Sequence, residues 1–196
     1  MHGLLNRAIQ CFLGDAYGLA VWVDVAGRAG IGPDGFEPLL SYDDRTTILL
    51  IEAAAAVLRR PRETVLEDLG TYLVSHPNRE GLRRLLRFGG TGFVEFLHSL
   101  DDLPDRARLA LADLDLPDLE LAEEGPQRFC LRCRSPVPGT GHVMVGLLRA
   151  MADDYGALAV LEHLGDDPGR GEEVVAIHLL ESRFAEGRRF DLVDQV

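Results

Sequence analysis

The sequence lacks the features that tie a chain to nucleic acid, to a membrane surface or to a disulfide framework. Its 20 basic side chains face 32 acidic ones, which gives a net charge of −12. That balance argues against nucleic acid and against anionic membranes as partners. Three cysteines in 196 residues are too few for a disulfide framework.

Long apolar segments are also missing. The longest, residues 47–58, contains Glu52 and is too short to cross a bilayer. The first residues do not read as a signal peptide, because Arg7, Gln10 and Asp15 interrupt their short apolar run. The composition, 46% hydrophobic and 27% charged, is that of an ordinary globular domain. We therefore expect a cytoplasmic protein without a membrane partner.

The first part of the chain carries the apolar spacing of helices. Pro61 can end one helix or open the next, SYDD at 41–44 can cap a helix, and Thr91 can cap another. The expected helices cover residues 3–13, 15–29, 44–59, 62–75, 79–88 and a segment after Gly90.

After residue 115 the pattern changes to the alternation typical of strands. The expected strands are 116–124, 127–135, 157–165 and 173–181, with a loop at 136–141, a helix at 142–156 and a hairpin around DDPGRGE. The fold class is therefore α+β, a helical N-terminal half followed by a ββαββ antiparallel sheet unit. We expect one domain over 1–196: a mainly helical part at 1–115, the sheet with one helix at 116–185, and a tail at 186–196.

Pro104 stands inside the helical stretch FLHSLDDLPDRARLAL. On a helical wheel it lies at the centre of an apolar stripe, within roughly 60° of its neighbours on that face. Position 104 should therefore look into the core. A proline in an uninterrupted helix costs about 3 kcal/mol or more, so we expect a break at 102–104, with a second helix starting there. The stripe consists of Phe93, Leu97, Leu100, Ala107 and Leu111.

The ordered set of motifs resembles the heme-nitric oxide/oxygen binding (H-NOX) domain of bacterial gas sensors and of soluble guanylate cyclase. The resemblance runs over nearly the whole chain and rests on these segments, in family order: MHGLLNRAIQCFLGDAYGLAVW, SYDD, LEDLGTYLV, LLRFGGTGFVEFLHSLDDL, LRCRSPVPG and HVMVGLLRAMADDYG. It implies the same helices-then-sheet fold and a heme b cofactor.

The resemblance also implies which residues would hold heme. Pro104 stands where the family has the histidine that ligates iron, and the ring nitrogen of proline is an amide with no lone pair to donate. The Y-x-S-x-R motif that binds the propionates falls on Cys133, Ser135 and Val137, of which only Ser135 matches. Since a Tyr hydroxyl and an Arg guanidinium are replaced, we expect histidine-ligated heme binding to be lost.

A histidine elsewhere in the chain could replace the lost iron ligand. His76, in SHPN, is the candidate for this role, whereas His98 should face away from position 104. His142 is expected to be solvent-exposed at a loop–helix junction. His163 and His178, on the last two strands, read as ordinary sheet histidines.

No metal site is expected from the remaining motifs. Cys130 and Cys133 in CLRC should point to opposite faces of a strand, and a second cysteine pair for zinc is lacking. No catalytic signature is present either: Ser135 has no G-x-S-x-G context.

These observations predict a stand-alone, non-enzymatic H-NOX-like sensor domain. Its pocket is collapsed, filled by side chains, or adapted to another apolar ligand. The alternative is a gas or redox sensor that keeps heme through a non-standard ligand. The resemblance implies a signalling partner in trans, a histidine kinase or a cyclic-di-nucleotide enzyme.

Overall fold

Four helices form the first part of the fold in the computed structural model, which describes residues 1–110, 116–167 and 171–188. They are α1 (Gly3–Tyr17), α2 (Leu19–Ala29), α3 (Asp44–Leu58) and α4 (Arg62–Ser75). Gly18, with φ +93°, separates α1 from α2. Asp43 caps α3 by accepting from the backbone N–H of Arg45, as the SYDD motif predicted.

Three short helices follow a 3-10 turn at Pro77–Arg79: α5 (Glu80–Arg87), α6 (Phe93–His98) and α7 (Leu103–Ala110). The break before α7 covers 99–102, slightly earlier than expected. The predicted cap of α6 was wrong. Gly92 is the N-cap residue, and Thr91 instead donates from its backbone and its hydroxyl to Glu95.

A four-stranded antiparallel sheet follows, with spatial order β1-β2-β4-β3. The strands are β1 (Asp118–Gly125), β2 (Arg128–Arg134), β3 (Leu158–Asp167) and β4 (Glu172–Glu181), and α8 (Thr140–Tyr155) connects β2 to β3. The α+β class and the ββαββ order are thus confirmed. Some of the expectations fall outside the described residues. They concern Leu111, the boundary at 115/116, the centre of the β3–β4 hairpin and most of the tail from 186.

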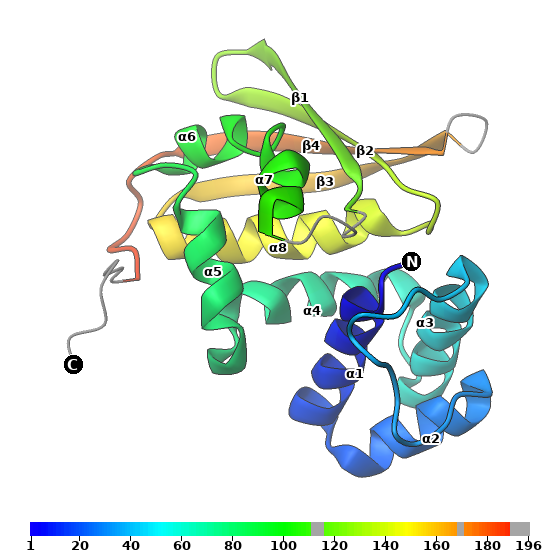
Figure 1. Ribbon diagram of the computed structural model, residues 1–196. Coiled ribbons are helices and arrows are strands. Elements are labelled where there is room, and N and C mark those ends of the chain that lie inside the picture. The colour runs from blue at the N-terminus through cyan, green and yellow to red at the C-terminus, as the bar shows by residue number, and fades with distance from the viewer. Residues whose placement is uncertain (111–115, 168–170, 189–196) are drawn as a thin grey trace.

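Helix α8 covers one face of the sheet, and α4 packs against the other side of α8 (Figure 1). The two helices approach closely because each presents a glycine. A Cβ added to Gly70 would lie 2.0 Å from the carbonyl oxygen of Val143, and one added to Gly146 would lie 1.9 Å from that of Glu67. Only glycine fits at such a backbone approach.

Two hydrophobic cores result. One joins the sheet, α6 and α8, and the other joins α1, α2, α3 and α4. Helix α4 contributes to both, with Val74 in the first and Leu66 in the second. Among the described residues, we find no helix that combines the length and the hydropathy needed to traverse a bilayer.

Candidate functional site

An apolar cavity of about 520 Å³ lies where the two cores meet. Its wall is built from α1, α3, α4, α5, α7, α8, the 3-10 turn, β1 and the loop between β2 and α8. Most of the lining side chains are aliphatic, among them Leu4, Leu5, Ile9, Leu66, Leu69, Leu73, Leu82, Leu86, Leu103, Ala107, Leu119, Val143, Met144 and Leu147. The pocket is therefore neither collapsed nor filled by side chains.

Pro104 is buried and forms part of this wall. It is the second residue of α7, where its missing N–H costs the helix no hydrogen bond. The first turn of α7 is closed by the N–H of Arg106, which donates to the carbonyl of Asp102 at 3.0 Å. A side chain with a donor atom at position 104 would project into the cavity; proline offers no such atom.

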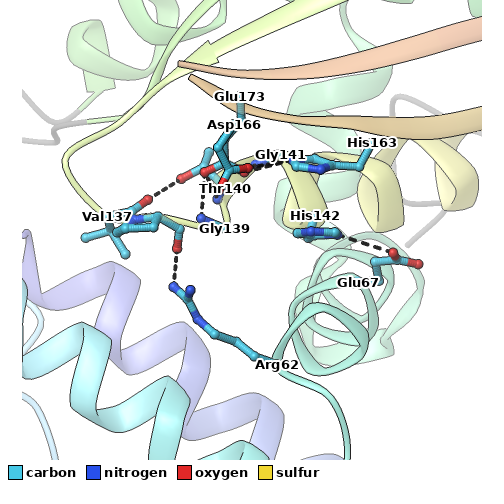
Figure 2. Close-up of polar contacts among 11 residues, drawn as sticks. Arg62, Glu67, Val137, Gly139, Thr140, Gly141, His142, His163, Asp166 and Glu173 are labelled. Atoms are coloured by element: carbon cyan, nitrogen blue, oxygen red, sulfur yellow. Dashed lines mark hydrogen bonds and ion pairs between the residues drawn. The ribbon is translucent and has the colours of Figure 1, made fainter. Parts of the chain in front are cut away.

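The loop from Ser135 to Gly139 forms another part of the wall. The Ser135 hydroxyl accepts from the N–H of Val137 at 3.2 Å. The Thr140 hydroxyl donates to the Val137 carbonyl at 3.0 Å, and Arg62 donates to the Pro138 carbonyl (Figure 2). Ser135 is thus used to shape its own loop, and Val137 contributes only apolar surface.

Glu173, on β4, holds the start of α8. Its carboxylate accepts backbone N–H bonds from Gly139 at 2.6 Å, from Thr140 at 3.1 Å and from Gly141 at 2.8 Å. Residues 139–141 were expected to be loop, but α8 begins at Thr140. A cap that comes from a strand 34 positions away leaves no local signal in the sequence.

Cys133 does not line the cavity. It lies in the core between the sheet and α8, with 1% of its surface exposed. Burial, followed by the charge of Glu173, raises the pKa of its thiol to about 12. Cys133 is therefore a neutral packing residue. Cys130 is buried outside that core cluster, in line with the opposite strand faces that the alternation predicted.

His76 lies outside the cavity wall, although Asn78 and Arg79 belong to it. The His76 ring packs on Tyr72 with centroids 4.8 Å apart, and its Nδ1 is 3.8 Å from a carboxylate oxygen of Asp15. The position therefore gives no support to His76 as an iron ligand.

The other histidines also lie outside the cavity wall. His98 is half exposed and pairs with Glu123 at 3.0 Å. His163 and His178 are not cross-strand partners, since β4 places Val175 opposite His163. His142 is only partly exposed, which corrects the expectation that it faces solvent, and its ring stacks on that of His163.

The charged groups at the wall are partnered within the protein. Asp44 pairs with the N-terminal ammonium at 2.7 Å. Arg79 donates from Nε to the Tyr72 hydroxyl at 3.1 Å. That hydroxyl in turn lies 2.6 Å from Asp15, and burial together with this contact raises the pKa of Tyr72 to about 12.

Within the described part of the chain, the cavity wall contains no imidazole, thiol or phenol. Its sulfur atoms belong to Met1 and Met144, residues that the sequence analysis did not single out. In size and polarity the cavity suits a large apolar ligand. Its donor set does not fit a histidine-ligated heme.

Comparisons with known proteins agree with this architecture. The family model described as Haem-NO-binding matches residues 2–163. Soluble guanylate cyclase gcy-31 of Caenorhabditis elegans is 25% identical over 166 residues, 85% of this chain and 24% of the relative. The soluble guanylate cyclase subunit beta-2 of Rattus norvegicus is 27% identical over 93 residues, 47% of this chain and 14% of the relative. The chain thus spans at most about a quarter of these relatives.

Solved structures share the whole fold. An H-NOX protein from S. oneidensis in the Fe(II)NO state superimposes with a TM-score of 0.76 at 18% identity, covering 92% of this chain and 100% of that one. A mutant H-NOX from T. tengcongensis gives a TM-score of 0.76 at 18% identity, covering 93% and 99%.

Proposed function

The chain belongs to the haem-NO-binding family, and on that premise we propose that it is a sensor domain whose cavity takes an apolar ligand without a histidine–iron bond. The observation that carries this proposal is Pro104, buried in the cavity wall at the position where the family resemblance expects the ligating histidine. An iron atom there would have no protein donor on that side.

The residues that would bind the two propionates of a porphyrin are also replaced. Val137 supplies no cation where the family motif has arginine. Arg79 is the guanidinium at the wall among the described residues, and its Nε is engaged by Tyr72. Leaving a buried charge without its partner costs roughly 3–5 kcal/mol. Two propionates placed in the family manner would therefore be bound poorly.

The cavity itself favours ligand binding. Its volume of about 520 Å³ lies within the range of small-molecule sites, roughly 300–1,000 Å³. Burying apolar ligand surface contributes about 25 cal/mol per Å². The ligand class that the wall suits is a large, mostly uncharged molecule.

Signalling would pass to a separate protein. Relatives of this chain are soluble guanylate cyclases, and the aligned segment is a minor part of each. The partner we propose is a histidine kinase or a cyclic-di-nucleotide enzyme acting in trans. Helix α7, which carries Pro104 into the wall, is the element whose position a ligand would change.

The test compares heme with metal-free protoporphyrin IX, which differ only in iron. Absorption titrations of the purified chain should give affinities within threefold of each other, because iron gains no protein bond. Pro104→His should raise the affinity for heme at least tenfold and leave that for protoporphyrin unchanged. Pro104→Ala is the matched control and should change neither.

A third variant tests the cavity. Ala107 is buried at the cavity wall. Its replacement by tryptophan should fill part of the cavity and block the binding of both porphyrins. The proposal fails if the chain leaves the cell with stoichiometric heme, or binds heme a hundredfold more tightly than protoporphyrin. If Met144→Leu then abolished that preference, the alternative of a non-standard iron ligand would hold, since the Met144 side chain lines the cavity.

A further inference from the structure

A second cluster of potential ligands lies on the sheet, outside the cavity wall. His163 Nε2, Asp166 Oδ1 and a Glu173 carboxylate oxygen lie within 4.8 Å of one another. His163 Nε2 is 3.1 Å from Glu173 Oε2 and 3.6 Å from Asp166 Oδ1. Figure 2 shows the three side chains converging above the start of α8.

A β-bulge creates this convergence. In a regular strand, residues three apart point to opposite faces, so His163 and Asp166 would diverge. The β3–β4 register shifts between His163 and Gly165, and Gly165 takes a φ of +113°. The bulge turns Asp166, which pairs directly with Glu173, onto the side that His163 faces. Bulges that re-aim side chains in this manner are frequent beside functional sites.

From this geometry we propose that His163, Asp166 and Glu173 form a binding site for a divalent transition metal, with Zn²⁺ as the best match. One imidazole and two carboxylates are ligands that zinc accepts. In a tetrahedral zinc site with bonds of about 2.0–2.1 Å, neighbouring ligand atoms are about 3.3 Å apart. The distances of 3.1 and 3.6 Å from His163 Nε2 to the two carboxylates bracket that value, and the carboxylate oxygens lie within 4.8 Å of each other.

The surroundings suit a bound cation. The side chains of His163 and Glu173 are 11% and 8% exposed, whereas Asp166 is 56% exposed. The ion would therefore have one buried ligand, one mostly covered ligand and an open side for water. Metal would take the place of the direct contact of 3.1 Å between His163 Nε2 and Glu173 Oε2.

His142 and Glu67 supply an outer layer. The His142 ring stacks on that of His163 with centroids 4.0 Å apart and planes inclined by 21°. On its far side, Nδ1 lies 3.5 Å from Glu67 (Figure 2). The stack holds the His163 ring in the orientation that aims Nε2 at the two carboxylates, which is the usual role of groups behind a metal ligand.

The site would also touch the cavity through one carboxylate. Glu173 Oε1 accepts from the N–H groups of Gly139 and Thr140, and both residues line the cavity. A metal on Oε2 therefore shares its ligand with the loop that forms the wall.

The experiment is a titration of the purified chain with Zn²⁺, followed by calorimetry and thermal unfolding. One equivalent should bind and raise the melting temperature. Asp166→Asn, at an exposed position, and His163→Gln, which keeps a donor toward Glu173, should each weaken binding at least tenfold. Glu162→Gln removes an exposed carboxylate from the same strand and should have no effect, as should His98→Gln.

Circular dichroism shows whether each variant is folded. The proposal is overturned if the folded chain binds no zinc, or if the Asp166 and His163 variants bind it as tightly as the parent. It is equally overturned if Glu162→Gln or His98→Gln lowers the affinity as much. None of these outcomes depends on what fills the cavity, so the proposed function is tested separately.

Discussion

Removal of the Asp154 side chain should strongly lower the stability of the protein. It lies near the end of α8 with 1% of its side chain exposed, and Oδ1 accepts from Arg83 Nε at 2.9 Å and lies 2.8 Å from Arg83 Nη2. Arg83 is itself buried, on α5. Asp154→Ala would remove the buried carboxylate that balances the charge of this guanidinium. Such a change lowers the free energy of unfolding by roughly 3–5 kcal/mol.

The structure selects the lower end of that range. Arg83 also donates to Glu80 at 2.8 Å, so it keeps one carboxylate. The second guanidinium at Asp154, that of Arg87, lies 3.5 Å from Oδ2 and loses a longer contact. We expect a loss of about 3 kcal/mol, which for a chain of this size corresponds to a fall in Tm of roughly 6–12 °C.

Chemical and thermal unfolding followed by circular dichroism measure the effect. The control is Asp153→Ala, a neighbouring and exposed aspartate on the same helix, where we expect a change of at most about 0.5 kcal/mol. Combining Asp154→Leu with Arg83→Met should recover part of the loss, because the buried Arg83 charge is removed together with its buried partner. If the free energies of unfolding of Asp154→Ala and Asp153→Ala differ by less than about 1 kcal/mol, the buried ion pair does not stabilise the fold as described.

Three further predictions concern other parts of the fold. Gly146→Ala should destabilise the protein by about 1–3 kcal/mol or more, since the added Cβ would meet the Glu67 carbonyl. Urea unfolding measures this effect, and an unchanged midpoint would contradict the prediction. Cys133, with its thiol pKa raised to about 12 by burial, should resist alkylation at pH 8 until the protein unfolds. The Tyr72 hydroxyl lowers the pKa of Asp15 below 3.8. The stability that Asp15 adds is therefore complete above that pH and fades as pH falls through the lowered pKa, so Asp15→Asn and the parent should converge in acid.

The helical half could be predicted closely from sequence, because its signals are local. Pro61 and the following apolar spacing define α4 at 62–75, and the structure gives Arg62–Ser75. The break before α7 follows from Pro104 for the same reason. At α6, by contrast, the Thr91 hydroxyl donates to Glu95 and does not cap the helix. A side-chain carboxylate within one turn competes with the backbone N–H groups for the same hydroxyl.

The metal-ligand cluster could not be predicted, because it depends on pairing across strands. His163 and Asp166 are three apart, which indicates opposite faces until a bulge is known to intervene. Glu173 reaches the start of α8 from a distant strand. The open cavity was one of three alternatives left by the sequence, since its volume depends on how the two cores meet.

The glycine contact between α4 and α8 determines which parts of the domain are able to move. With Gly70 and Gly146 at backbone contact, the two helices have no room to slide and behave as one rigid frame. Displacement by a ligand would then fall on the elements that face this frame across the cavity, namely α1, α3, α5 and α7. A partner that detects the bound ligand would accordingly contact those helices and not the α4–α8 pair.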